Sequence, residues 1–167
     1  TSDNTAANVL LNRFGGPAAV TAFWRSLGDD VSQLNRFEPA LNETPGGTTL
    51  DTTTPEAMAH TVAKMVHGDA LTPPNRTLLK TWMAEVKTGS NRIRAGLPTG
   101  WESGDKTGTG FTATKQSYVD LAYAGPKGRA PLIITGYFEP AVKSDDMDPA
   151  AMAVLADVGR IAAQSME

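Results

Sequence analysis

The chain contains no cysteine, which excludes both a disulfide framework and thiolate chemistry but leaves the compartment undecided. It also has no apolar run that approaches the length of a membrane span. With a net charge of −3 and a pI near 5.4, it lacks the clustered basic residues that nucleic-acid phosphates require. What remains is one acidic globular domain whose 167 residues can enclose a real core.

Histidine is almost as scarce. His60 and His67 stand seven residues apart on one expected helix without a second pair of metal ligands, so packing or solvent contact is favoured over zinc. The acidic run from Asp145 to Asp148 lacks the glycine and terminal glutamate of a calcium loop and is better explained as a turn and helix cap. The sequence therefore predicts no metal site and no cofactor.

The sequence that is present begins with helical patterns. Apolar residues at helical spacing, bounded by capping residues, prolines and glycines, predict four helices: from Ser2 or Asp3 to Gly15, Pro17 to Leu27, Thr54 to Gly68, and Thr72 to Gly89. We expect the fourth to bury Leu78, Leu79, Trp82 and Val86. A long loop, residues 33–51, has its own apolar anchors and is typical of a functional loop.

After Pro98 the apolar period becomes that of β-strands. Three strands are predicted, at Trp101–Thr109, Ser117–Ala124 and Pro131–Phe138, followed by a final helix that Asp148 caps. The result is an α+β fold, with residues 1–95 mainly helical and residues 96–167 forming an antiparallel sheet and a C-terminal helix. A helix on one face of three strands leaves the other face open, so we expect its cover to come from sequence outside this chain.

Three short segments carry complementary chemistry. Ser2-Asp3-Asn4 offers a hydroxyl and an amide at a helix start, and Glu38 and Asn42 offer a carboxylate and an amide inside the long loop. Lys106-Thr107-Gly108 offers an ammonium on a glycine-rich strand, where bare N–H groups can hold a carbonyl or carboxylate. Asp105 stands where a phosphate loop requires glycine, which excludes that motif. Singly, the segments are also consistent with a helix cap, a solvated loop charge and an ordinary strand.

Together, and in this order, the segments resemble the class A serine β-lactamases, whose motifs are S-x-x-K, S-D-N and K-T-G with a loop glutamate. The segment from Arg36 to Glu43 is similar to that family's omega loop nearly letter for letter, and Leu50 to Pro55 is similar to its exit. The similarity runs over all 167 residues, and it is strongest to mycobacterial and other actinobacterial members of the family.

The serine and lysine of S-x-x-K have no true counterpart in the chain. Only Ser103 to Lys106 matches the letters, and Gly104 disfavours a helix start there. The chain therefore resembles the C-terminal part of a single catalytic unit, and we expect it to begin within the domain.

The resemblance implies a serine acyl-enzyme that water then releases. Glu38 would be the base that activates this water, and Asn42 would fix the water from the other side. Ser2 would relay a proton to the departing lactam nitrogen, with Lys106 favouring its alkoxide character.

The resemblance also assigns the substrate contacts. Asn4 would bond the substrate's side-chain amide, and the strand residues Lys106, Thr107, Gly108 and Thr109 would receive its carboxylate. The Thr109 N–H would be one oxyanion donor, worth roughly 3 kcal/mol. Arg92 would assist with the carboxylate, with Arg94 as the neighbouring candidate and a solvated surface position as the alternative.

Four further residues are implied to support the loop. Arg36 and Asp51 would form the ion pair that closes it, and Asn8 would bond the loop near Glu38. The Glu38–Pro39 peptide is a candidate cis bond.

The implied activity is hydrolysis of penicillins and cephalosporins, giving antibiotic resistance. The enzyme would be exported (periplasmic, cell-envelope or secreted), would bind β-lactamase inhibitors as well, and would be a monomer when complete. One alternative is a D,D-peptidase-like penicillin-binding enzyme, against which Glu38 and Asn42 argue. The other is a non-catalytic fragment that needs an N-terminal partner, which the lack of the serine favours.

Overall fold

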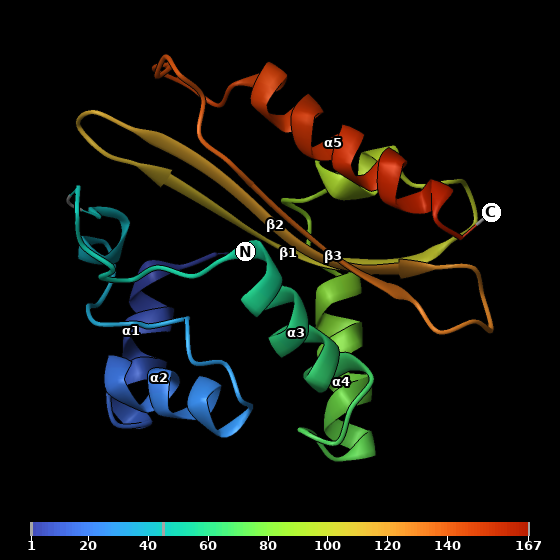
Figure 1. The fold of residues 1–167 in the computed structure, drawn as a ribbon, viewed down its shortest axis with the longest axis horizontal. Coiled ribbons are helices and arrows are strands. Elements are labelled where there is room, and N and C mark those ends of the chain that lie inside the picture. The colour runs from blue at the N-terminus through green and yellow to red at the C-terminus, as the bar shows by residue number, and fades with distance from the viewer. Residues whose placement is uncertain (1, 45, 167) are drawn as a thin grey trace. The chain divides into compact units, whose positions relative to one another are not determined.

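The computed structural model describes residues 2–44 and 46–166, which form two compact units that meet within one helix, between Thr61 and Val62. Figure 1 gives the order of the elements. The α-helices are α1 (Asn4–Arg13), α2 (Pro17–Ser26), α3 (Pro55–Val66), α4 (Pro73–Ala84) and α5 (Pro149–Gln164). Two short 3₁₀ helices are η1 (Ala40–Asn42) and η2 (Ile93–Gly96), and the strands are β1 (Glu102–Phe111), β2 (Gln116–Gly125) and β3 (Leu132–Phe138).

The first unit holds α1, α2 and the long loop. Asp3 starts α1 as its cap, because its Oδ1 accepts the Ala6 N–H at 2.7 Å. The loop begins at Asp29, whose Oδ1 accepts the Val31 and Ser32 N–H groups and whose Oδ2 accepts the Thr61 hydroxyl at 3.2 Å. Asp29 therefore ties the start of the loop to α3.

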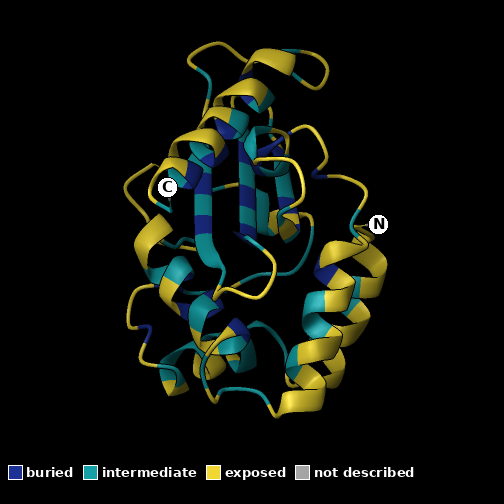
Figure 2. Cartoon of the chain, turned by 90° about the vertical axis from the view of Figure 1, so that its right-hand side faces the viewer, coloured by how far each residue is buried: buried dark blue, intermediate teal, exposed yellow. Residues whose placement is uncertain are grey.

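The second unit is built on the antiparallel sheet β1-β2-β3. In its register Thr107 pairs with Asp120 and Lys106 pairs with Leu121, so these two pairs point to opposite faces. Buried positions alternate accordingly along β2 from Gln116 to Ala122 (Figure 2). Helix α5 and η2 pack on the face that carries Asp120, and α4 meets the other face at β1 (Figure 1).

The packing of η2 against α5 requires glycine. A Cβ on Gly159 would lie 2.2 Å from the carbonyl oxygen of Ile93, and a Cβ on Gly96 would lie 1.9 Å from that of Ala156. Ile93 is completely buried by this contact and packs with the strand residues Ala122, Ala124 and Ile134. The two glycines thus let η2 reach the core of the second unit.

The α+β class is confirmed, and all five helices and all three strands lie where the sequence predicted them. The predicted end of the fourth helix was wrong. Helix α4 stops at Ala84 and not near Gly89, because Arg94 donates to the carbonyl oxygens of Ala84 and Val86 and so satisfies the helix end. Its predicted buried side was also partly wrong, since Leu78 and Trp82 are 43% and 60% exposed.

The expectation of an uncovered sheet face is corrected as well. The Tyr123 hydroxyl donates to the Lys80 carbonyl oxygen at 3.0 Å, and a Cβ on Gly104 would lie 2.6 Å from the Ala84 nitrogen. Helix α4 therefore lies against β1 on the face opposite α5, and the second unit covers part of both faces itself.

We predict that Gly159→Ala lowers the free energy of unfolding of the intact protein by about 1–3 kcal/mol, because the new methyl group meets a backbone atom that cannot move aside alone. Urea denaturation measures the change. Gly46→Ala is the control, since a Cβ there meets nothing within 4 Å. Equal stability of the two variants would contradict the tight packing of α5 on η2.

Candidate active site

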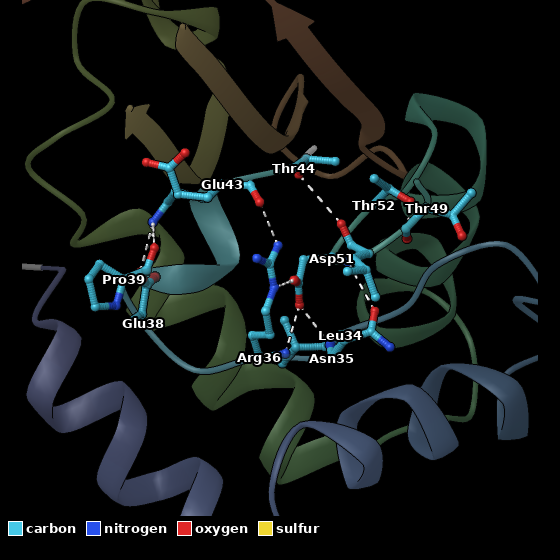
Figure 3. A network of polar contacts seen from close by, with 12 residues as sticks. Leu34, Asn35, Arg36, Glu38, Pro39, Glu43, Thr44, Thr49, Asp51 and Thr52 are labelled. Atoms are coloured by element: carbon cyan, nitrogen blue, oxygen red, sulfur yellow. Dashed lines mark hydrogen bonds and ion pairs between the residues drawn. The ribbon is translucent and has the colours of Figure 1, made fainter. Parts of the chain in front are cut away.

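The long loop is closed at its neck by an ion pair between Arg36 and Asp51 (Figure 3). Arg36 Nε lies 2.6 Å from Asp51 Oδ2, while Asp51 Oδ1 accepts the N–H groups of Asn35 and Arg36 at 2.6 and 2.9 Å. Burial alone would raise the pKa of Asp51, but these hydrogen bonds and the guanidinium hold it below its ordinary value. The expected ion pair is present, and it is charge-assisted and shielded from water.

Further hydrogen bonds hold the two ends of the loop together. The Asp51 N–H donates to Asn35 Oδ1 at 3.0 Å, and the Gln33 N–H donates to the Thr52 carbonyl oxygen at 3.0 Å. Arg36 Nη2 reaches across the loop to the Glu43 carbonyl oxygen at 2.8 Å (Figure 3). One arginine therefore fixes both the neck and the interior of the loop.

Glu38 is held from two sides. The Asn8 side chain on α1 donates to the Glu38 carbonyl oxygen and accepts the Glu38 N–H, both at 2.9 Å, as expected. Asn42 Nδ2 donates to Glu38 Oε2 at 2.9 Å, since η1 brings it back beside the carboxylate. The Glu38–Pro39 peptide is cis, as the sequence suggested. This is a fixed carboxylate with an amide next to it, an arrangement suited to holding and deprotonating a water molecule.

Ser2 and Asn4 lie at the start of α1, on either side of its cap. Asn8 is one turn further along the same helix and contacts the loop directly. A single helix therefore carries both the Ser-Asp-Asn segment and the residue that clamps Glu38.

The Lys-Thr-Gly segment lies in the second unit, on β1, as predicted. Lys106 Nζ donates to the Thr107 carbonyl oxygen at 2.5 Å, and the hydroxyls of Thr107 and Thr88 are 2.6 Å apart. Partial burial lowers the pKa of Lys106, an effect that neighbouring Asp105 opposes. Gly108 and Thr109 follow on the same strand, where they pair with Val119 and Tyr118 of β2.

Arg92 is not the solvated surface arginine of the alternative interpretation, because it is buried, and its assistance with the substrate carboxylate stays a prediction. It is 1% exposed, and its Nη1 donates to the carbonyl oxygens of Gly108 and Val119, both at 2.8 Å. Its Nη2 meets the Thr109 hydroxyl at 2.5 Å. Burial lowers the pKa of Arg92, an effect that Asp120 opposes. The guanidinium thus fixes the strand that would bind the substrate.

Several of these supports could not be found from the sequence. Thr88 and Asp29 stand in loops without any periodic signal, and they acquire partners only when distant segments come together. Arg94 was considered only as an alternative to Arg92, whereas it forms an ion pair at 2.5 Å with the buried Asp105.

An apolar cavity of about 270 Å³ opens beside Lys106 in the second unit. Helices α3 and α4, the segment just after α4, and strands β1 and β2 supply its walls: Val62, Met65, Leu79, Trp82, Met83, Val86, Asp105, Lys106 and Leu121. Apart from the two charged residues, the lining is almost entirely hydrocarbon, so the cavity suits apolar side chains better than a polar ligand.

Within residues 2–44 and 46–166, no three histidine or acidic side chains gather into a site that could hold a metal ion. In the same part of the chain, no helix has both the length and the apolar character needed to cross a bilayer.

Comparison with known proteins agrees with the geometry. The model of the beta-lactamase enzyme family matches residues 1–166. The solved structure of an ancestral class A β-lactamase superposes with a TM-score of 0.86 at 48% identity, covering 98% of this chain and 60% of that one. The solved β-lactamase of Streptomyces albus G gives a TM-score of 0.86 at 42% identity, covering 98% and 59%.

Curated relatives include the β-lactamase of Streptomyces albus G, 43% identical over 99% of this chain and 51% of its own length. Another is β-lactamase FAR-1 of Nocardia farcinica, 47% identical over 91% of this chain and 46% of its own length. The chain belongs to the beta-lactamase enzyme family, with the fold of its class A members. It spans about half the length of these curated relatives, which include actinobacterial proteins as the sequence suggested.

We predict that Asp51→Asn loosens the loop and lowers its stability to local opening by about 1–3 kcal/mol, because the buried ion pair with Arg36 is lost. Hydrogen exchange of the Asn35 and Arg36 amides measures this opening. The pKa of Asp51 is lowered in the folded loop. The carboxylate therefore contributes its full stabilisation of the loop above the unfolded pKa of about 4, and this stabilisation is lost only as the pH falls through the lower folded pKa.

Asp30→Asn is the matched control, since Asp30 is exposed in the same unit. Faster exchange in both variants would show that the effect does not come from the ion pair.

Proposed function

We propose that the protein containing this chain hydrolyses the β-lactam amide of penicillins and cephalosporins through a serine acyl-enzyme. Residues 1–167 would form the C-terminal part of its single catalytic unit. The observation that carries the proposal is the Glu38–Asn42 pair, because a clamped carboxylate beside an amide is what deacylation by water requires. The curated relatives, which are named β-lactamases, support it.

In the deacylation step Glu38 takes a proton from the water that attacks the serine ester. Asn42 donates to the Glu38 carboxylate at 2.9 Å and would orient the same water, so the attacking oxygen and its base are fixed together. A positioned base of this kind contributes a factor of about 10²–10⁴ in rate.

In the acylation step the nucleophilic serine and its lysine partner come from sequence outside residues 1–167. Ser2 passes a proton to the lactam nitrogen as the C–N bond breaks, and the Lys106 ammonium stabilises the charge on the Ser2 oxygen during the transfer. Asn4 bonds the substrate's side-chain amide.

The strand residues receive the substrate carboxylate. Thr107 and Thr109 supply hydroxyls on either side of Gly108, Lys106 supplies the positive charge, and the Thr109 N–H supplies one oxyanion donor. Arg92 acts through Thr109, since it holds that hydroxyl and the Gly108 carbonyl oxygen from beneath the strand.

The complete protein would be exported, would give resistance to β-lactam antibiotics, would bind β-lactamase inhibitors at the same site and would act as a monomer. A D,D-peptidase-like activity is disfavoured, because such an enzyme has no use for a fast hydrolytic base such as Glu38.

The second proposal concerns the partner of the apolar cavity beside Lys106. The relatives have about as much sequence again as this chain covers, and the cavity lining is hydrocarbon. We infer that the N-terminal part of the same enzyme places apolar side chains in it, whether the two parts are one polypeptide or separate pieces. A fragment without that part would bind the N-terminal part but would not itself hydrolyse β-lactams.

We predict that Glu38→Gln slows deacylation by about 10²–10⁴-fold, because glutamine keeps the shape but cannot accept the proton. Intact-mass spectrometry of the protein after mixing with a penicillin should show a stable adduct of one whole ligand mass, since ring opening releases nothing. Glu43→Gln, in the same loop and exposed, should turn over like the natural protein.

The same mass measurement on the natural protein tests the function itself. A transient adduct is expected with a slowly released β-lactam, and no adduct on any species would remove the hydrolase proposal.

We predict that Leu79→Lys weakens association with the N-terminal part by about tenfold or more, because it buries a charge in the apolar cavity. The two parts would be produced as separate pieces and copurified. Leu78→Lys is the matched control, since Leu78 is the next residue on α4, is 43% exposed and lies outside the lining. Equal copurification of both variants would exclude the cavity as the docking site.

A further inference from the structure

Two aspartates are completely buried side by side in the second unit. Asp105 on β1 pairs with Ala122, and Asp120 on β2 pairs with Thr107, so the two carboxyl groups are diagonal neighbours on the face that η2 covers. Their charges act on each other, since the neighbouring Asp105 contributes to the raised pKa of Asp120. The proposed function gives neither of them a role.

The available donors do not satisfy both carboxylates. The Ile93 N–H donates to Asp120 Oδ2 at 3.0 Å, and Arg94 Nε lies 2.5 Å from Asp105 Oδ1. Among the described residues, no hydrogen-bond donor serves Asp105 Oδ2 or Asp120 Oδ1. A buried carboxylate oxygen without a donor is costly, so the pair requires at least one more proton.

Water has little room to supply that proton. A Cβ on Gly89 would lie 1.6 Å from Asp105 Oδ2, which means that the backbone of the preceding loop is already in contact with this oxygen. Both aspartates are 0% exposed. The proton must therefore come from one of the two carboxyl groups.

The charged groups around the pair direct most of their donors elsewhere. Arg92 donates through Nη1 and Nη2 to β1 and β2, and Arg94 donates through its Nη atoms to the end of α4. Lys106 on β1 donates to the Thr107 carbonyl oxygen, and Lys80 on α4 lies over the Tyr123 ring. The charged residues of α5, Asp157 and Arg160, form an ion pair with each other in solvent. The Tyr118 hydroxyl, on β2, accepts the Asp148 N–H at 2.6 Å, and its ring lies beside Arg92.

We propose that Asp105 and Asp120 share a single proton and together act as positioning residues for the Lys106–Thr107 segment. Asp120 donates its O–H to Asp105, which remains ionised against Arg94. Two carboxylates in contact cannot both be charged at low cost, and the shared proton links β1 to β2 directly beneath Lys106 and Thr107. Only the consequence for substrate depends on the proposed function.

The direction of the titration agrees with this geometry. Burial and the neighbouring Asp105 raise the pKa of Asp120 to about 7, and burial also raises the pKa of Asp105 against the opposing charge of Arg94. A carboxyl group whose folded pKa is raised contributes stability that is complete below its unfolded value near about 4 and is lost as the pH rises through about 7.

The test is Asp120→Asn in the intact protein. Asparagine keeps an oxygen for the Ile93 N–H and replaces the O–H with an N–H that can donate to Asp105, so it copies the protonated state at every pH. We expect a Tm at about pH 8 that equals or exceeds that of the natural protein, and a smaller fall in Tm between about pH 5 and about pH 8. Infrared difference spectra should lose the carbonyl stretch of a buried protonated carboxyl group.

Asp105→Asn is the matched control. It leaves Arg94 without its ion pair and should lower the Tm throughout the same pH range. A lower Tm for Asp120→Asn at about pH 8, or no protonated carboxyl signal in the natural protein at neutral pH, would overturn the proposal and show instead that both aspartates are ionised.

The positioning role has its own readout. With a β-lactam substrate, the kcat and KM of Asp120→Asn should equal those of the natural protein at about pH 6 and should not change as the solution becomes alkaline. Asp120→Ala should raise KM at every pH. The opposite order would remove the positioning role. If the natural protein hydrolyses no β-lactam, the proposed function fails, while the infrared and stability results still decide the shared proton.

Discussion

The buried guanidinium of Arg92 is the contact on which the second unit depends. It joins the end of the loop before η2 to the carbonyl oxygens of both β1 and β2 and to the hydroxyl of Thr109. Without it, the carbonyl oxygens of Gly108 and Val119 would each lose a donor. Because three acceptors converge on one rigid planar group, the strand pair is held by geometry as well as by charge. The strand segment to which the substrate contacts are assigned is therefore held by a buried arginine from outside the sheet.

The sequence was sufficient for the α-helices, the strands and the family, because apolar periods, helix caps and glycine-rich turns are local signals, but it did not predict the short helices η1 and η2. It also predicted the bonds of Asn8 to Glu38 and the ion pair of Arg36 with Asp51, but through resemblance to a known loop and not through periodicity. It could not place Arg92, since a guanidinium two residues from Arg94 has the same local pattern whether it is buried or exposed. Nor could it show that α4 ends at Ala84, because the group that completes the helix end, Arg94, follows ten residues later. Errors of this kind arise where tertiary contacts between distant segments override local preference.

The two units divide the proposed chemistry between them. The first holds a carboxylate and its amide in a loop closed by one ion pair, and the second holds the cationic strand above buried aspartates. In each unit these groups are fixed by hydrogen bonds within that unit. Val9 and Leu10 of α1, and Phe14 directly after it, are also exposed apolar side chains in a chain that spans about half the length of its curated relatives.

The contact between η2 and α5 has a consequence for how this protein can change over time. Gly96 and Gly159 bring the carbonyl oxygens of Ala156 and Ile93 within the reach of a single methyl group, so backbone meets backbone without side chains between them. The distance between α5 and η2 is then set by the contact of their backbone atoms and not by the volume of the neighbouring side chains. Residues around this contact, including Leu155 and Val158, can be exchanged for others of similar size while the helix keeps its place. Sequence drift can therefore alter the core of the second unit without passing any displacement to the strand that carries Lys106.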